Sequence, residues 1–269
     1  MDIREDNSIG DWRNTILLTS DDADNRESLF VEHAESIYYQ VKATQPELNA
    51  AKVYADAYKQ YASSAGTTYP DASKAINQQM KKGALILNYV GHGSPTHLSA
   101  ERLITITDMM GWTNYNSMPV FITSTCEFAR FDMVDKPSAG EYSILNENGG
   151  AIALISASRK INSEENINNA FHKEILEKIN GRPKTIGEAF VATKNARFDM
   201  SENKRSVLLL GDPALRLSLP MYNVKTDSIL STQTNLIIDT IKALQQIKLI
   251  GSIVDDNDSL LDGFNGILQ

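Results

Sequence analysis

Short apolar runs alternate with longer segments of 3.6-residue periodicity along the first 215 residues of the chain. This alternation is typical of α/β proteins, in which strands covered by helices on both faces are apolar throughout. It predicts a mostly parallel, six-stranded sheet with helices on both faces. The predicted strands are Thr15–Thr19, Ala51–Tyr54, Ala84–Tyr89, Pro119–Ser124, Ala151–Ser156 and Val207–Leu210.

Apolar residues that share one helical face predict helices between these strands. His33 and His172 fall within two of these helices and are expected to be ordinary packing or surface residues. The apolar faces comprise Phe30, Ala34, Ile37 and Val41; Ala72, Ile76 and Met80; and Ile167, Phe171, Ile175 and Ile179.

Capping signals mark where some of these helices begin and end. Capping boxes that open at Ser138 and Thr185 predict helix starts. Gly149 and Gly181 stand where the glycines that end helices are expected.

The pattern changes after Pro220, where Asn235–Ile238 and the alternating Ile247–Ile253 segment predict strands between polar turns. We therefore expect an α/β domain over 1–220 and an incomplete β-sandwich (Ig-like) segment over 221–269. Asp255–Ser259 could be a calcium loop, but it lacks the EF-hand spacing, which favours a solvated turn. The last residues suggest a chain cut within this β-rich segment.

The composition and net charge exclude several classes of partner and site for this chain. The net charge of −8 argues against a nucleic-acid or anionic-membrane partner. The chain begins without an apolar signal segment, and no apolar run is long enough to span a membrane. A single cysteine excludes an internal disulfide and a Cys-only metal site, so Cys126 is either a buried structural thiol or a reactive one.

Two predicted strands end in unusual polar sequences. Gly91-His92-Gly93-Ser94 follows one apolar run and Thr125-Cys126-Glu127 follows another. Carboxyl ends of parallel strands open on the same edge of the sheet, where ligands bind in open α/β folds. The sequence therefore predicts a thiol and an imidazole close together at that edge.

A Cys–His pair suits nucleophilic attack on a peptide carbonyl. The thiolate is the nucleophile, and the histidine takes its proton or pairs with it and later protonates the leaving amine. The N–H groups of Gly93 and Cys126 could stabilise the developing oxyanion. This chemistry needs no metal and no organic cofactor.

Other interpretations of the same residues are weaker. His92 alone could be an ordinary loop histidine, but its combination with Cys126 at a second strand end favours a functional site. A His92–His97 metal pair is disfavoured because Pro95 breaks a helix and no acidic third ligand has a usual spacing. Gly211–Pro213 lacks the signature of a phosphate loop, and acidic Thr19–Asp22 would repel phosphate.

The two strand-end motifs resemble those of clan CD cysteine peptidases: caspases, legumain, clostripain and gingipains. The closer resemblance is to the gingipain family, in the segments Asn88–Ser94, Ala23–Asn25 with Glu27-Ser28, and Gly211–Leu215. It extends from about residue 11 to residue 220 and implies a caspase-like fold and cysteine endopeptidase activity.

The resemblance also implies roles for individual residues. His92 and Cys126 match the catalytic pair, Gly93 matches the oxyanion glycine, and Asp21 falls where an acidic partner of the histidine lies. Asp22 is the neighbouring candidate for that acidic partner.

The same resemblance implies a substrate-binding set. Leu29 stands where arginine-specific gingipains place an aspartate, and an apolar side chain cannot pair a buried cation, so a preference for arginine is not expected. Small side chains in the segment after the fifth strand suggest an open pocket. The expected substrate-binding residues are Leu29, Glu127, Ser156, Ala157, Ser158 and Arg159.

Within the family, Thr125–Arg130 is most similar to the PorU branch, which removes C-terminal sorting signals from cargo of the type IX secretion system. This resemblance implies secreted protein substrates, outer-membrane partners, a place at the bacterial cell surface and transfer of the acyl group to a lipopolysaccharide amine. Gingipain catalytic regions have a preceding α/β subdomain that is not expected here, so the chain should be a fragment. A catalytically silent scaffold of a secretion machine is the alternative.

Overall fold

The computed structural model describes residues 8–23, 29–64, 66–161, 165–196, 203–220, 222–255 and 257–264. The chain divides into two compact units. The first comprises Met1–Ile179 and Pro183–Leu219, and the second comprises Asn180–Arg182 and Pro220–Gln269. Within the described ranges no helix has the length and apolar character that crossing a membrane requires.

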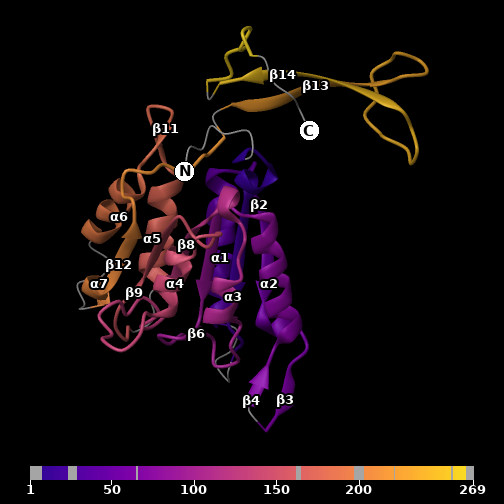
Figure 1. Ribbon diagram of the computed structural model, residues 1–269. Helices are drawn as coiled ribbons and strands as arrows, with labels where there is room; N and C mark the ends of the chain where they lie inside the picture. The colour runs from indigo at the N-terminus through magenta and orange to yellow at the C-terminus, as the bar shows by residue number, and fades with distance from the viewer. Residues whose placement is uncertain are drawn as a thin grey trace. The chain divides into compact units, whose positions relative to one another are not determined.

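A six-stranded sheet with the order β12-β9-β8-β5-β1-β2 forms the centre of the first unit (Figure 1). All neighbouring strands are parallel except β12, which runs antiparallel to β9 at one edge. The prediction of six strands in a mostly parallel sheet is confirmed. The strands are β1 (Thr15–Ser20), β2 (Asn49–Tyr54), β5 (Ile86–Val90), β8 (Val120–Ser124), β9 (Ala153–Ala157) and β12 (Val207–Gly211).

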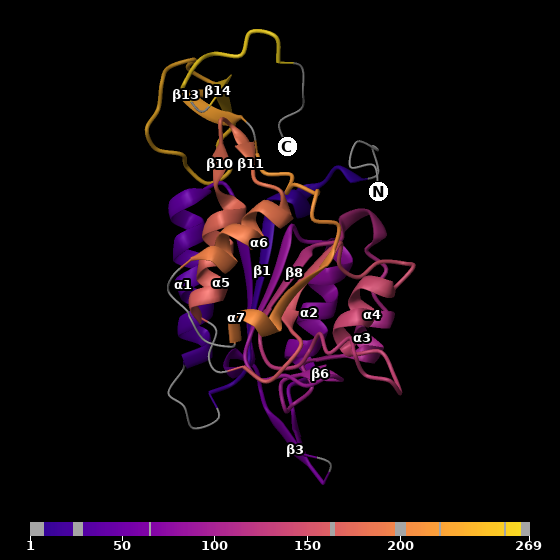
Figure 2. The same cartoon turned by 90° about the vertical axis from the view of Figure 1, so that its left-hand side faces the viewer.

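Helices cover both faces of this sheet. Figure 2 shows α1, α5 and α6 on one face and α2, α3 and α4 on the other. Each face has its own buried apolar cluster, one around Ile16, Ile37 and Phe171 and the other around Leu17, Met80 and Phe121. The helices are α1 (Leu29–Thr44), α2 (Pro70–Lys82), α3 (Ile106–Met110), α4 (Ala139–Leu145), α5 (Glu165–Leu176), α6 (Ile186–Asn195) and α7 (Asn203–Ser206).

Both predicted capping boxes are present, at the starts of α4 and α6. The predicted helix ends are wrong. Ile179 lies in a short strand with its side chain 54% exposed, because α5 ends at Leu176. Gly181 follows that strand with a φ of 74°, a backbone conformation that suits glycine. Gly149 lies four residues beyond the end of α4, where its backbone packs against Asn114.

The remaining elements of the chain are short. Within the described ranges, 3-10 helices include η2 (Asp11–Asn14), η3 (Ala55–Ala57) and η4 (Tyr115–Ser117). The others are paired strands, β3 (Tyr61–Ser63) with β4 (Gly66–Thr68), β6 (His97–Leu98) with β7 (Ile104–Thr105), and β10 (Lys178–Ile179) with β11 (Arg182–Pro183).

The second unit contains the antiparallel strands β13 (Asn223–Ser231) and β14 (Ile247–Val254). The strand predicted over Ile247–Ile253 is confirmed, whereas Asn235–Ile238 contributes only a single bridge, between Ile237 and Leu230. The Asp255 carboxylate accepts hydrogen bonds from the N–H groups of Asn257 and Ser259. This is a polar turn of the kind that the sequence favoured over a calcium loop.

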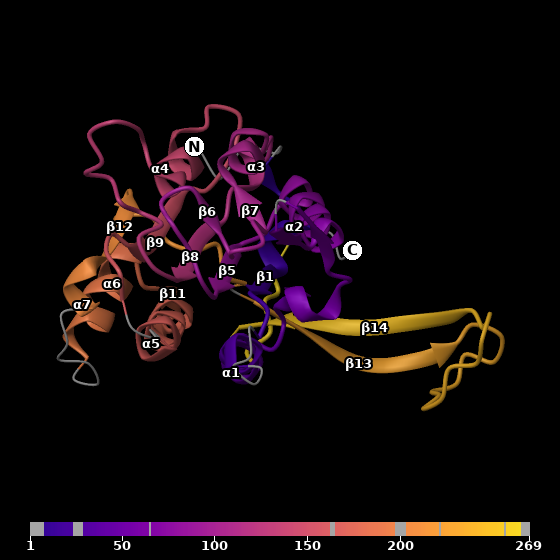
Figure 3. The ribbon, with the colours of Figure 1, turned by 90° about the horizontal axis from the view of Figure 1, so that it is seen from below.

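The strand order reverses at β1, which determines where a site can form. The chain passes from β1 to its neighbour β2 and then returns to add β5 on the other side of β1. A crevice is expected outside the carboxyl ends of strands at such a reversal. Figure 3 views the first unit from below, with β12, β9, β8, β5 and β1 side by side.

Candidate active site

The two predicted catalytic residues follow neighbouring strands in the same register. Val90 at the end of β5 pairs with Ser124 at the end of β8, and the Gly91 N–H donates to the Ser124 carbonyl over 3.2 Å. His92 and Cys126 therefore each stand two residues beyond a paired position. The parallel sheet brings the imidazole and the thiol to the same edge, as the sequence predicted.

Asp21 follows β1 directly and is buried. Its N–H donates to the Val90 carbonyl over 2.9 Å, and its Oδ2 accepts the main-chain N–H of His92, also over 2.9 Å. The structure thus brings Asp21 to His92, with the contact made to the backbone. The predicted role of Asp21 as partner of the imidazole stays a prediction.

The imidazole of His92 is exposed and packs edge-on against the ring of Phe30 at the start of α1, with ring centroids 5.2 Å apart. Within the described ranges neither ring nitrogen of His92 has a hydrogen-bond partner. The ring nitrogens are thus available to a thiol or to a substrate. Leu29 precedes Phe30 at the start of α1 and is half-buried.

Tyr89 is a residue of this site that the sequence analysis missed. Its side chain is fully buried in β5, and its hydroxyl donates to the carbonyl of His92 over 2.7 Å. Sequence reasoning treated Tyr89 as one more core residue of an apolar strand. The only available signal was a hydroxyl-bearing side chain three residues before His92, a spacing that does not by itself specify a contact.

The two predicted oxyanion donors are free within the described part of the chain. Hydrogen bonds from Ser94 N–H to the His97 carbonyl and from Ser99 N–H to the His92 carbonyl flank the Gly93–Leu98 bridge. In such an antiparallel arrangement the bridged residue does not use its own N–H. Neither the Gly93 N–H nor the Cys126 N–H donates a hydrogen bond to any described residue.

The Cys126 thiol donates to the carbonyl of Ile161 over 3.3 Å. The segments after β8 and β9 are also joined by the Glu127 N–H to the Arg159 carbonyl and the Ala129 N–H to the Ala157 carbonyl. The thiol is half-buried and its proton is held by main chain. This is a resting arrangement, because attack on a substrate requires the sulfur to lose that proton.

The five predicted pocket residues other than Leu29 separate into two groups. The prediction is wrong for Ser156 and Ala157, which belong to β9 and have no exposed surface. The Ser156 hydroxyl instead accepts from Thr123 within the sheet, over 2.6 Å. Ser158 is mostly buried and its hydroxyl donates to the Ser206 carbonyl.

Glu127 and Arg159 have accessible side chains beside the nucleophile. Glu127 has a φ of 49° and pairs with Arg130 over 3.1 Å, while Arg159 pairs with Asp132 over 2.6 Å. Of the four residues in these two ion pairs, the sequence predicted only Glu127 and Arg159 to bind substrate. Both remain candidates for that role.

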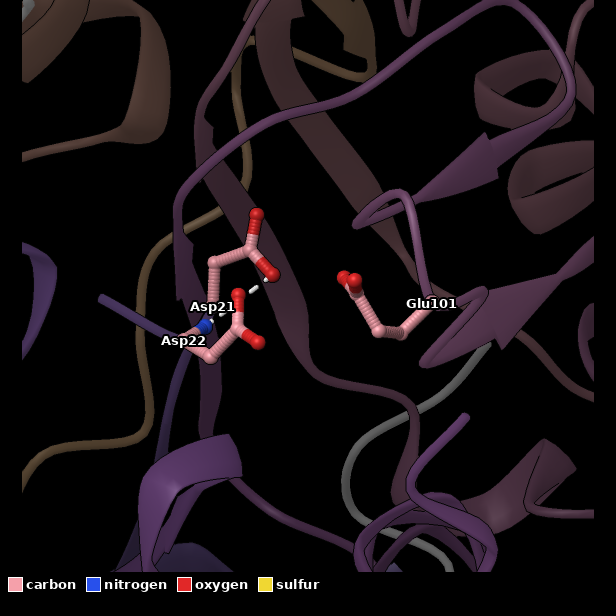
Figure 4. Close-up of side chains that lie close together, drawn as sticks. All are labelled: Asp21, Asp22 and Glu101. Carbon is pink, nitrogen blue, oxygen red and sulfur yellow. Dashed lines mark hydrogen bonds between the residues drawn. The ribbon is translucent and has the colours of Figure 1, made fainter. Parts of the chain in front are cut away.

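Three buried carboxylates gather beside His92, and the sequence predicted only two of them. Oxygen atoms of Asp21, Asp22 and Glu101 lie within 4.8 Å of one another. Figure 4 shows Glu101 pointing from the segment between β6 and β7 toward the two aspartates, and the Asp22 N–H donating to Asp21. Further partners are Tyr69 and Gln60 on Asp22, and Ser99 and Thr67 on Glu101.

Burial and crowding change the ionisation of this acidic cluster. Burial raises the pKa of Asp21 to about 6, and the charges of Asp22 and Glu101 act in the same direction, while hydrogen bonds from Ser99 and His92 oppose the change. The same three carboxylates offer oxygen donors of the kind that Ca²⁺ takes.

The other histidines do not complete a metal site among the described residues. Nδ1 of His97 lies 2.8 Å from the Thr96 hydroxyl and 3.2 Å from that of Ser94. His172 is fully buried in α5, and burial lowers its pKa to about 4, so it is a neutral core residue as expected. His33 is also buried on α1.

Fold and site together define an α/β protein that places a cysteine, a histidine and two free N–H donors at the carboxyl edge of a parallel sheet. The sequence model of peptidase family C25 matches residues 1–218, and the chain belongs to that family. This confirms the resemblance to gingipains. No curated protein sequence matches the chain.

Solved structures show the same fold. The Arg-specific cysteine proteinase gingipain R (RgpB) matches with a TM-score of 0.59 and 17% identity, covering 93% of this chain and 66% of that one. The complex of the pro- and mature domains of Porphyromonas gingivalis RgpB matches with a TM-score of 0.60 and 15% identity, covering 96% and 64%. The chain thus spans about two thirds of the structures it matches.

Proposed function

We propose that this chain is the catalytic part of a cysteine endopeptidase, with Cys126 as nucleophile and His92 as general base and acid. One observation carries the proposal: the N–H groups of Gly93 and Cys126, both free of partners among the described residues, lie at the strand ends that bear the imidazole and thiol. Free donors at such a position suit an oxyanion that forms during acyl transfer. Membership of a peptidase family supports the same reaction.

The proposed reaction begins when the thiol leaves the Ile161 carbonyl and passes its proton to His92. The sulfur then bonds to the peptide carbonyl carbon, and the resulting oxyanion accepts from the Gly93 and Cys126 N–H groups. Collapse of this intermediate breaks the C–N bond, and His92 protonates the departing amine. Water or an amine attacks the thioester, His92 takes the attacker's proton, and the thiol is restored.

We further propose the finer role that the resemblance implies, namely removal of C-terminal sorting signals from secreted cargo by a PorU-type peptidase of the type IX secretion system. An amine acceptor on lipopolysaccharide, outer-membrane partners and a cell-surface location belong to this proposal. An apolar Leu29 at the start of α1 supports a substrate preference other than arginine. The same proposal includes residues 221–269 as the opening of an Ig-like domain.

Alkylation of Cys126 by iodoacetamide tests the proposed catalytic pair. At about pH 6 the native thiol should react at least about ten times faster than the thiol of the urea-denatured chain, because the imidazole favours the thiolate. His92→Ala should remove this advantage. His97→Ala is the matched control, since it deletes an imidazole from the same loop region and should leave the rate unchanged.

The alternative function, a catalytically silent scaffold, predicts a different result. A native thiol that reacts no faster than the denatured one, and is indifferent to His92→Ala, would favour the scaffold and contradict the peptidase proposal. Hydrolysis of an extended peptide library by the wild-type chain, absent in Cys126→Ala, would support the peptidase.

A further inference from the structure

Tyr89 stands in β5 three residues before His92, and its hydroxyl also interacts with the Asp21 carboxylate. It is fully buried in β5, and its hydroxyl reaches forward three residues to donate to the carbonyl of His92 over 2.7 Å. The Ser99 N–H donates to the same carbonyl over 2.8 Å. Two donors from different segments therefore fix the direction of one carbonyl group.

That carbonyl belongs to the peptide unit that also contains the N–H of Gly93. The peptide unit is planar and trans, so its C=O and N–H point in opposite directions. A carbonyl held by Tyr89 and Ser99 consequently fixes the Gly93 N–H so that it points away from them. The Gly93 N–H has no acceptor among the described residues, which leaves it available to a ligand.

The surrounding backbone is adapted to this contact. Gly91 has a φ of 150°, and a Cβ there would lie 2.7 Å from the Tyr89 hydroxyl and overlap Asp21. Asp21 accepts the His92 N–H from the other end of the residue. Tyr89 and Asp21 thus hold both peptide units of His92, and the glycine before it leaves space for both side chains.

We propose that Tyr89 is a positioning residue, whose hydroxyl orients the His92–Gly93 peptide so that the Gly93 N–H stabilises the oxyanion. This inference rests on the proposed function and adds a residue to it. It requires Tyr89 to matter for reactions of Cys126 that build negative charge on a carbonyl oxygen. Reactions of the same thiol that build no such charge should not need Tyr89.

Two small probes separate these requirements in the full chain. p-Nitrophenyl acetate acetylates Cys126 through an oxyanion intermediate: a C–S bond forms, the ester C–O bond breaks and p-nitrophenolate departs. Iodoacetamide alkylates the same sulfur by displacement of iodide, without an oxyanion. We expect Tyr89→Phe to slow the p-nitrophenolate burst about 10-fold or more and to change the alkylation rate less than about 2-fold.

Tyr69→Phe is the matched control, because Tyr69 is also buried and its hydroxyl donates to Asp22 of the acidic cluster, over 2.8 Å, with no contact to the His92 carbonyl. It should leave the ratio of the two rates unchanged. Circular dichroism and the urea midpoint of each variant establish that it is folded. Tyr89→Phe keeps the buried ring and leaves the Ser99 hydrogen bond on the His92 carbonyl.

The outcomes distinguish this inference from the function on which it rests. Equal slowing of both reactions by Tyr89→Phe, or no slowing of either, would overturn the assignment of Tyr89 while a wild-type burst still supported the peptidase. A wild-type burst no larger than that of Cys126→Ala would overturn the proposed function and the role of Tyr89 with it. The inference would be established if the ratio of the acetylation rate to the alkylation rate fell in Tyr89→Phe and stayed unchanged in Tyr69→Phe.

Discussion

Asp21 is held at the end of β1 in a place where its charge is unfavourable. Burial is the main cause, and Asp22 and Glu101 add like charges. Its pKa of about 6 in the folded chain lies above the ordinary value of 3.8. Protonated Asp21 therefore favours the folded state below about pH 4, and this contribution is lost as the pH rises through about 6.

We expect Asp21→Asn to stabilise the chain at about pH 8, by on the order of 2 kcal/mol, and to have little effect at about pH 4. The amide oxygen can still accept the His92 N–H, and the amide carries no charge at either pH. Its nitrogen replaces the oxygen that accepts the Asp22 N–H, and this loss applies at both pH values. Urea unfolding of wild type and variant at both pH values measures the difference. Carboxylates outside the acidic cluster titrate equally in both proteins and cancel in the comparison.

The exposed Asp135 provides the control for this prediction. Asp135→Asn removes a charge of the same sign, and among the described residues no contact joins Asp135 to the acidic cluster. The ionisation described for Asp21 would be contradicted by an Asp21→Asn variant that is less stable than wild type at about pH 8, with a larger loss of stability there than at about pH 4.

Sequence reasoning succeeded for residues whose position follows from the ends of apolar strands. His92 and Cys126 were predicted in this way, since each follows a run that must be a buried strand. Tyr89 and Glu101 were missed because their roles depend on contacts made across the fold. A tyrosine in an apolar run and a glutamate in a loop carry no sign of their partners.

At the scale of elements, the segments that follow β5 and β8 fit closely against each other. A Cβ at Gly93 would overlap Thr125 Oγ1, which is buried and without a hydrogen-bond partner among the described residues. Leu98 Cδ2 would lie 3.2 Å from the same Cβ. The absence of a side chain at position 93 is therefore a condition for the two strand ends to meet.

We expect Gly93→Ala to destabilise the chain by about 1–3 kcal/mol through overpacking. Thr125→Ala removes the overlapping atoms, so the double variant Gly93→Ala/Thr125→Ala should recover most of that loss. A double-mutant cycle from urea unfolding measures the coupling. Additive effects of the two changes would show that the strand ends are not in contact as described.

The errors in element prediction also have a physical cause. The apolar periodicity that continued to Ile179 did not extend α5, because the next residues, Asn180 and Gly181, both have positive φ. Ala157 was expected in a loop, yet β9 continues through it because its backbone pairs with Val207 of β12. Short polar or small residues at strand ends leave such boundaries undetermined by sequence.

At the scale of the whole molecule, both buried apolar clusters consist of residues that precede Pro220. A two-stranded hairpin such as β13–β14 is marginally stable in water by itself. The first unit should therefore contain nearly all of the cooperative folding free energy of this chain.

We expect a variant ended after Leu219 to unfold at a temperature within about 3 °C of the full chain. This expectation follows because the deletion removes no residue of either cluster. Differential scanning calorimetry measures both transitions. A truncated protein that unfolds about 10 °C lower, or that has lost its cooperative transition, would contradict the expectation.

The strands that precede Asp21, His92 and Cys126 are β1, β5 and β8, and each of them has a neighbour on both sides. In amide hydrogen exchange, interior strands of a sheet open only with the global transition, whereas edges fray at lower free energy. Transient opening of β2 or β12 would thus leave the three anchoring strands paired. The three strand ends that hold these residues together are therefore separated only when the sheet itself unfolds.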